Sequence, residues 1–144
     1  MLLSSTAISK TINKIEIIGN DRITDETIKL FISVSKDDEI NDIKLNNVLN
    51  ALYETNFFKN ITINFKEQIL LITVEENPII EDVNYNGIKS NKILELIKQD
   101  TFIKSRSSFN ENLLKKEKIK IENILKNLGY YNSNLEILVN ESKN

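Results

Sequence analysis

The sequence predicts an α+β fold made of two tandem copies of a β-α-α-β-β unit, the second without its last strand. Three observations predict this fold. Four groups of mostly apolar residues recur in the same order in the two halves of the chain. Short segments alternate apolar and polar residues, as half-buried strands do. Longer segments repeat apolar residues at the spacing of a helix.

The repeat also divides the chain into parts. The matching groups are Ile15-x-Ile17-x-Gly19 with Val83-x-Tyr85-x-Gly87, then Ile28, Phe31 and Ile32 with Ile93, Leu96 and Ile97, then Ile40-Asn41 with Phe109-Asn110, and finally Asn56-Phe57-Phe58 with Gly129-Tyr130-Tyr131. Pro78 is the single proline and lies between the two copies. We therefore predict an N-terminal extension over residues 1–11, a first unit over residues 12–78 and a second unit over residues 79–144.

The first strand and the first helix of the unit follow from residues 12–32. Apolar residues alternate over residues 12–18, which predicts a strand that ends at Gly19. Thr24 is a favourable N-cap residue and precedes apolar residues spaced i, i+3, i+4. We therefore expect a helix after Thr24 that turns these apolar residues to one face.

A second helix and a hairpin complete the unit. Asn41 is a candidate N-cap, and an apolar stripe at helical spacing runs from Leu45 to Tyr53. Asn56 is expected to end this helix, because Asn tolerates the left-handed conformation found just after helices. Residues 60–65 and 69–74 are then predicted to form two strands joined by a tight turn.

The second copy differs at its C-terminal end. Its second helix is predicted from Asn110 to Leu128, and its second strand over residues 134–139. No residues for a third strand follow before Asn144, so we expect the sequence to be a fragment of a longer protein. The segment from Met1 to Ala7 resembles the end of a signal peptide, and a plain N-terminal extension is the alternative.

The composition favours a binding or structural role over catalysis. The chain has no His and no Cys, so it lacks an imidazole base, a thiol nucleophile and the usual zinc ligands. Its three glycines are not neighbours and cannot form a Gly-rich phosphate loop. We therefore predict that the protein is not an enzyme and uses no cofactor or metal. A formal charge of −2 and an arginine-poor basic set argue against nucleic acid as a partner.

Several segments together resemble POTRA domains. Residues 12–28 (INKIEIIGNDRITDETI) resemble the start of such a domain, and residues 49–58 (LNALYETNFF) resemble its second helix and the following turn, with Asn56 in place of Gly. Residues 76–89 (ENPIIEDVNYNGIK) are similar to the junction between successive POTRA domains. The resemblance covers nearly everything from Ile12 onward. The residues at the motif positions, to which it gives structural roles, are Gly19, Asn20, Tyr53, Asn56, Phe57, Phe58, Pro78, Gly87, Gly129, Tyr130 and Tyr131.

The resemblance implies a three-stranded mixed sheet covered by two helices, with the second strand at an edge. It also implies a periplasmic docking module, to whose edge strand an extended segment of a partner adds as a further strand. The implied partners are unfolded outer-membrane protein clients, periplasmic chaperones and accessory lipoproteins. Contact with the membrane would come only through a C-terminal barrel that this sequence does not contain. The candidate binding residues are Asn60, Ile61, Thr62, Ile63, Asn64 and Phe65 in the first unit, and Asn134, Leu135, Glu136, Ile137, Leu138 and Val139 in the second.

Alternatives stay open at this point. The strand edges can be solvated without binding anything, and the module can belong to a related secretion or translocation transporter or to a division protein. A KH-type RNA-binding domain shares a β-α-α-β run, but residues 35–39 and 99–106 lack its Gly-x-x-Gly loop. The aromatic pairs Phe57-Phe58 and Tyr130-Tyr131 are expected to pack between the second helix and the sheet. Lysines within residues 115–120 are expected to be a solvated helix face, with an acidic partner or an anionic lipid surface as the alternative.

Overall fold

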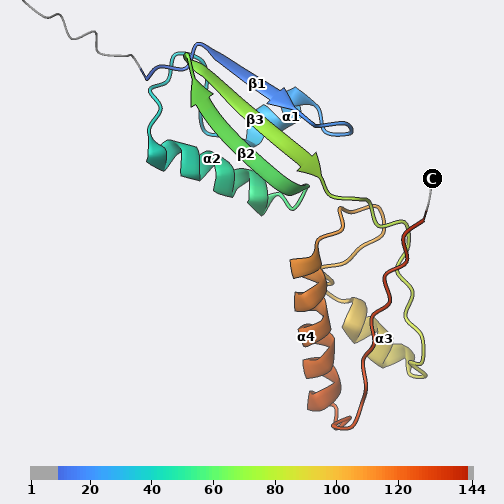
Figure 1. The fold of residues 1–144 in the computed structure, drawn as a ribbon. Coiled ribbons are helices and arrows are strands. Elements are labelled where there is room, and N and C mark those ends of the chain that lie inside the picture. Colours follow the sequence, from blue (N-terminus) through green and yellow to red (C-terminus); the bar gives the residue numbers. More distant parts are fainter. Residues whose placement is uncertain (1–9, 143–144) are drawn as a thin grey trace, which may run out of the picture. The chain divides into compact units, whose positions relative to one another are not determined.

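The computed structural model describes residues 10–142, and the chain forms one compact unit that ends at Asn77 and a second that begins at Pro78. The predicted extension over residues 1–11 falls mostly outside the described residues. The first unit contains β1 (Lys14–Ile18), α1 (Asp25–Phe31), α2 (Asp42–Glu54), β2 (Phe58–Lys66) and β3 (Ile69–Glu76), and the second contains α3 (Asn91–Lys98) and α4 (Glu111–Asn127) (Figure 1).

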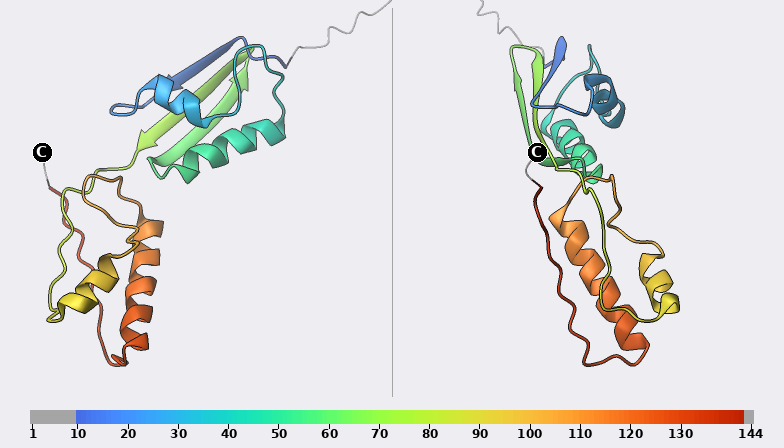
Figure 2. Two further views of the ribbon diagram at one scale, coloured as in Figure 1. Left: turned by 180° about the vertical axis from the view of Figure 1, so that it is seen from behind. Right: turned by 90° about the vertical axis from the view of Figure 1, so that its right-hand side faces the viewer.

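The strands of the first unit form a mixed sheet in the order β1-β3-β2. The central strand β3 pairs in parallel with β1, where Ile17 lies opposite Ile72, and antiparallel with β2, where Ile63 also lies opposite Ile72. Both helices cover the same face of the sheet (Figure 2). The predicted α+β fold with a three-stranded mixed sheet is therefore confirmed for this unit, with the second strand at an edge.

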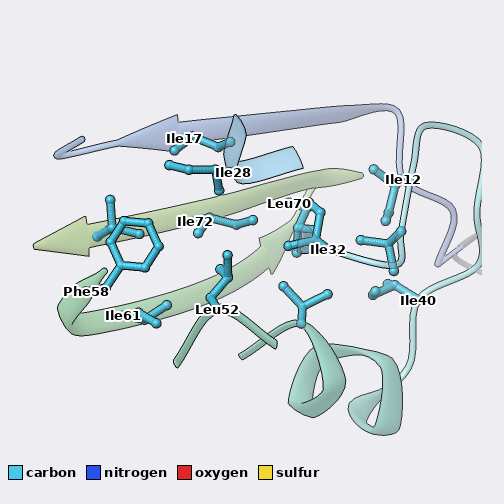
Figure 3. Packing of buried hydrophobic residues seen from close by; sticks show 13 residues of the cluster. Ile12, Ile17, Ile28, Ile32, Ile40, Leu52, Phe58, Ile61, Leu70 and Ile72 are labelled. Atoms are coloured by element: carbon cyan, nitrogen blue, oxygen red, sulfur yellow. The ribbon is translucent and has the colours of Figure 1, made fainter. Parts of the chain in front are cut away.

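The core lies between this sheet face and the two helices (Figure 3). Alternate residues of β3 point into it, so that Leu70, Ile72 and Val74 are buried while the residues between them are more exposed. Val48 and Leu52 of α2 are fully buried against them, in agreement with the predicted stripe. Burying each such aliphatic side chain contributes about 1.5–3 kcal/mol relative to leaving it exposed to water.

The predicted helix ends agree well with the structure. The Thr24 hydroxyl accepts a hydrogen bond from the Thr27 N–H (3.3 Å), and Asn41 Oδ1 accepts one from the Lys44 N–H (2.8 Å). Asn56 follows α2 with a φ of 59°, which is the left-handed conformation that its position after the helix predicts. Phe31 differs from its expected place on the buried face, since it is 41% exposed and meets Phe57 edge-on instead.

The turn between β2 and β3 is shorter than the predicted ends of the two strands indicate. Both strands extend beyond their predicted ends, and only Glu67 and Gln68 separate them. These two residues have φ values of 53° and 64°, as a two-residue turn of the I′ type requires. Gly and Asn are the usual residues in such a turn, so the long strands hold two ordinary side chains in a conformation that they otherwise avoid.

A buried carboxylate holds the loop between β1 and α1 against the end of β3. Glu76 Oε1 accepts hydrogen bonds from the backbone N–H groups of Asp21 (2.8 Å), Arg22 (3.0 Å) and Ile23 (2.9 Å). Glu76 Oε2 faces Arg22 Nε at 3.0 Å, and the Glu76 side chain is 8% exposed. Burial on its own raises the pKa of Glu76, but the three N–H donors and the Arg22 charge outweigh it and hold the pKa below its ordinary value.

The second unit repeats one loop of the first. In the first unit, residues 10–12 exchange backbone hydrogen bonds with residues 37–40; they are Ile12 N–H to Asp38 O, Asp37 N–H to Ile12 O, and Ile40 N–H to Lys10 O. In the second unit the equivalent bonds are Ile80 N–H to Ser107 O, Arg106 N–H to Ile80 O, and Phe109 N–H to Pro78 O. The predicted extension over residues 1–11 includes Lys10 and Thr11, yet Lys10 accepts the bond from Ile40 and Thr11 forms an isolated β-bridge with Glu39, so both lie within the first unit.

The second unit has no sheet among its described residues, which corrects two predictions. Residues 83–86, the counterpart of β1, and residues 134–139, the predicted second strand, are both irregular. The physical reason is visible in the first unit, where β1 and β2 pair only with β3 and never with each other. Residues 78–142 contain no counterpart of β3, so neither segment has a partner strand.

The missing sheet also changes the surroundings of the second aromatic pair. Phe58 is buried in the first unit, and Phe57 packs against its core, as predicted. Tyr130 and Tyr131 are exposed, by 51% and 77%, so the prediction that they pack between a helix and a sheet is wrong. Gly129 does follow α4 in the left-handed conformation, with a φ of 90°.

Packing in the second unit depends on α3, α4 and the loop between them. Ile97, Ile103 and Ile121 are buried there. Glu117 is 3% exposed and accepts a hydrogen bond from the Phe102 N–H at 2.7 Å. Lys120 donates to the carbonyls of residues 97 and 99 at the end of α3, which satisfies acceptors that a helix leaves open.

A substitution at Gly19, the residue that follows β1, tests how closely the chain approaches β3 at this point. A Cβ atom at Gly19 would lie 2.1 Å from the Val74 carbonyl oxygen, and the φ of Gly19 is +87°. We expect Gly19→Ala to lower the free energy of unfolding of the first unit by more than about 3 kcal/mol, because the clash adds to the backbone strain. Gly87→Ala is the matched control, with a φ of +80° and open space around it, and should cost about 1–2 kcal/mol. Urea denaturation followed by circular dichroism measures both variants, and equal losses would contradict the close approach.

Glu76 should make the stability of the first unit depend on pH. Its pKa is lowered in the folded state, so its contribution is complete above the unfolded pKa and is lost as the pH falls through the folded pKa. We expect Glu76→Gln to lower the free energy of unfolding by about 1–3 kcal/mol at neutral pH, because hydrogen bonds to a charged acceptor are the stronger kind. The difference from the wild type should shrink towards acid pH.

Denaturant unfolding at a series of pH values measures this difference. The neighbouring exposed Glu75 provides a matched control, and Glu75→Gln should cause a far smaller loss. If the difference in the free energy of unfolding between wild type and Glu76→Gln stays constant from neutral pH to about pH 3, the charge of the Glu76 carboxylate does not stabilise the unit.

Candidate strand-binding edge

The candidate site of the first unit is the outer edge of β2. This strand has β3 on one side and no strand on the other among the described residues. All six residues predicted in this unit, from Asn60 to Phe65, lie in β2. The opposite edge of the sheet is β1, which spans five residues against nine in β2. The six residues predicted in the second unit, 134–139, form no strand and therefore no edge.

A groove of about 420 Å³ runs beside this edge, between β2 and α2. Its apolar lining comes from both elements and consists of Leu45, Leu49, Ile61 and Ile63, and its polar lining consists of Asp42, Asn46 and Thr62. The helical stripe that builds the core continues to the groove, so the same amphipathic pattern supplies both. An apolar groove alongside open backbone groups is a suitable surface for an extended peptide.

The backbone of β2 presents alternate residues to the open side. The Ile61 N–H donates to the Tyr53 hydroxyl at 3.2 Å and therefore points away from β3. Residues two apart on an antiparallel strand turn their backbone groups to the same side. Ile63 and Phe65 thus present their N–H and C=O groups along the open edge, while the Tyr53 hydroxyl accepts the N–H of Ile61.

Charged and polar side chains border the edge at its ends. Lys59 and Asn60 both contact the Glu75 carboxylate across the β2–β3 pair, with Lys59 Nζ at 3.2 Å. The hydrogen bond from Asn60, followed by that from Lys59, lowers the pKa of Glu75. Lys66 lies exposed at the turn. Lysines on an edge strand disfavour indiscriminate pairing with other strands.

None of the motif residues lines the groove, and some of them make hydrogen bonds elsewhere in the first unit. The Asn20 side chain donates to the Ile23 carbonyl (2.8 Å) and to Asp25 Oδ1 (3.0 Å), which fixes the approach to α1. Asn56 accepts a hydrogen bond through its carbonyl from the Asn77 side chain at 2.9 Å. The sequence did not reveal the contact of Tyr53 with β2, because nothing in the local pattern of a helix indicates which strand its tyrosine reaches.

Residues 10–142 hold no cluster of three or more His, Cys, Asp or Glu side chains suited to a metal ion. Within the same range, none of the helices is long and apolar enough to cross a membrane.

Comparison with known proteins identifies relatives of both sequence and fold. Residues 10–77 match the family model POTRA, described as a surface antigen variable number repeat. The chain is 28% identical over 94 residues to the outer membrane protein assembly factor BamA of Neorickettsia risticii, and 29% identical over 99 residues to that of Neisseria meningitidis. These matches cover 65% and 69% of the chain but only 12% of each relative.

Solved structures of low sequence identity share the fold. The N-terminal domain of Omp85 from Thermosynechococcus elongatus superposes with a TM-score of 0.56 at 16% identity, covering 84% of this chain and 53% of that one. The first two POTRA domains of Omp85 from Anabaena give a TM-score of 0.55 at 14% identity, covering 92% of this chain and 88% of that one.

The hydroxyl of Tyr53 should protect one edge amide. We expect Tyr53→Phe to speed hydrogen exchange at the Ile61 amide, because water replaces the hydroxyl on that N–H. The loss of one hydrogen bond should cost about 0.5–1.5 kcal/mol of stability. Amide exchange followed by NMR measures the effect residue by residue. The exposed Tyr131 is the control, since Tyr131→Phe should leave Ile61 unchanged. An Ile61 amide that exchanges at the same rate in Tyr53→Phe would contradict the assignment.

Proposed function

Because residues 10–77 match the POTRA family model and the chain is similar to BamA, we propose that it is a periplasmic, non-enzymatic protein-binding module of an outer-membrane protein assembly factor. It docks extended segments of unfolded outer-membrane protein clients, of periplasmic chaperones or of accessory lipoproteins. The chain spans about an eighth of the length of the BamA relatives, so the assembly reaction itself would depend on parts of such a protein outside this sequence.

The observation that carries the proposal is the open edge of β2 beside its groove. A partner strand placed along Ile63 and Phe65 would form backbone hydrogen bonds that do not depend on its sequence. Alternate side chains of that strand would enter the groove beside Leu45 and Leu49, which favours aliphatic and aromatic residues at every second position. Outer-membrane β-strands have this alternating pattern, so one surface can accept many of them.

The physical chemistry of the edge also suits transient binding. A single added strand gains one ladder of hydrogen bonds and buries only part of its apolar face, while it loses the conformational freedom of every residue that it orders. The net affinity is therefore weak, as a module that must release its clients requires. The lysines at both ends of β2 add selectivity through charge rather than strength.

Titration with a peptide from an outer-membrane β-strand tests the proposal. Backbone amides of residues 60–65 are expected to shift in NMR spectra, together with residues that line the groove. Asn46→Trp should weaken binding about tenfold, because the exposed Asn46 borders the groove and a large ring there would fill it.

Asn47→Trp is the matched control. Asn47 is equally exposed and lies next to Asn46 on α2, but it does not line the groove. The Asn47→Trp variant should therefore bind the peptide as the wild type does. Equal binding by both variants, or amides of β2 that do not respond at saturating peptide, would refute strand addition at this edge.

A further inference from the structure

The groove beside β2 has different chemistry at its two ends. The chain turns back after α2, so the helix and the strand run side by side in opposite directions (Figure 1). The start of α2, with Asp42, therefore lies towards Phe65, and the end of α2, with Tyr53, lies at Ile61. A strand that adds to this edge meets a carboxylate at one end of the groove and a tyrosine hydroxyl beyond the other end.

The hydroxyl of Tyr53 already occupies one backbone donor of the edge. It accepts the Ile61 N–H at 3.2 Å, which is the bond that an added strand would otherwise make at this position. Because a partner must break this bond before it can form its own, pairing at Ile61 replaces one hydrogen bond by another and gains little. Tyr53 therefore favours a ladder that ends before Ile61.

The part of the edge that stays open is short. Alternate residues of β2 turn their backbone groups outwards, and these include Ile63 and Phe65. Lys66 is the last residue of the strand before the turn, and at the other end the register with β3 shifts between Phe58 and Asn60. A regular ladder along the open edge is therefore confined to the stretch around Ile63 and Phe65.

Among the described residues, Asp42 is the single charged one that lines the groove. It is exposed, and within residues 10–142 its carboxylate takes part in no ion pair. Lys66 pairs with Glu67 at 3.6 Å and belongs to the alternate set of β2 side chains, which points away from the helices. Lys44 donates to the Glu39 carbonyl at 2.7 Å. A basic side chain of a partner would therefore reach the Asp42 carboxylate without displacing a lysine of the chain.

We propose that Tyr53 and Asp42 select the segment that binds the first unit, as a stretch of about five residues that is apolar at alternate positions and has Lys or Arg at the end near Asp42. The inference rests on the proposed function and specifies the chemistry of the partner. Tyr53 limits the length of the hydrogen-bond ladder, and Asp42 attracts the basic residue that borders it. The groove between them takes the apolar side chains.

Capped peptides that alternate valine and threonine test the limit set by Tyr53 on the whole chain. In the wild type, a peptide of about nine residues should bind at most about twofold more tightly than one of about five residues. In Tyr53→Phe the longer peptide should bind about fivefold more tightly than the shorter one, because it can pair with the Ile61 N–H. Peptide-induced protection of the Ile61 amide should appear in this variant alone. Tyr131→Phe is the control and should behave as the wild type does.

The shorter peptide with lysine or glutamine at one terminus tests the role of Asp42. Each terminus is tested in turn, because only one of them lies near Asp42. At that terminus, lysine in place of glutamine should tighten binding to the wild type about threefold, and Asp42→Asn should remove this preference. The preference should also fall as salt is added. Glu54→Gln is the matched control and should keep the preference, since Glu54 is exposed on α2 and does not line the groove.

The possible results distinguish this selection from strand binding itself. If the wild type binds the longer peptide about fivefold more tightly than the shorter one and protects Ile61, then Tyr53 does not limit the ladder. If lysine has no effect at either terminus, or the same effect in Asp42→Asn, the groove does not select a basic residue. Either result overturns the inference and leaves the proposed function standing. If no peptide shifts the amides of β2, both are overturned.

Discussion

The first unit depends on one constraint of topology, which is that its last strand lies in the middle of its sheet. β3 supplies both hydrogen-bond ladders and the three aliphatic side chains that meet the helices. Without it, β1 and β2 would be two separated segments with no partner. The second unit shows this situation directly, since its equivalent segments keep the apolar alternation but form no strands. An alternating apolar pattern thus makes a segment compatible with a strand. The strand forms only when a neighbouring backbone supplies the hydrogen bonds of a ladder.

The C-terminal end of β3 organises the rest of the unit through two short-range contacts. Gly19 brings the end of β1 so near to Val74 that a side chain would not fit. Two residues further along β3, Glu76 Oε1 accepts hydrogen bonds from three backbone N–H groups of the loop that follows β1. Such a concave set of donors is a favourable place for an anion. The carboxylate therefore fixes the path of the chain into α1, whose cap Thr24 follows directly, so that sheet and helix are joined by charge as well as by packing.

Much of this arrangement could be predicted from local sequence. Thr24 and Asn41 are recognisable caps because the first turn of a helix needs acceptors for its open N–H groups, and Asn56 stands where a left-handed residue is needed. The family resemblance placed β2 at an edge. The contacts that define the edge could not be predicted, because the Tyr53 hydroxyl reaches Ile61 and Glu76 reaches Ile23 only after the chain has folded. The strands predicted in the second unit are absent for the same reason. Alternation can be recognised from neighbouring residues, whereas strand pairing depends on a segment that is distant in the sequence.

The central position of β3 also sets the order in which the unit can be built. A chain that is synthesised, or threaded through a pore, from its N-terminus delivers β1 long before Ile69 to Glu76 arrive. The parallel β1–β3 pairing must close a loop that includes both helices, and long-range pairing of this kind is slow. The sheet of the unit therefore cannot close until its final eight residues are free. The unit, which we propose to bind unfolded chains, would itself pass through the same vulnerable state.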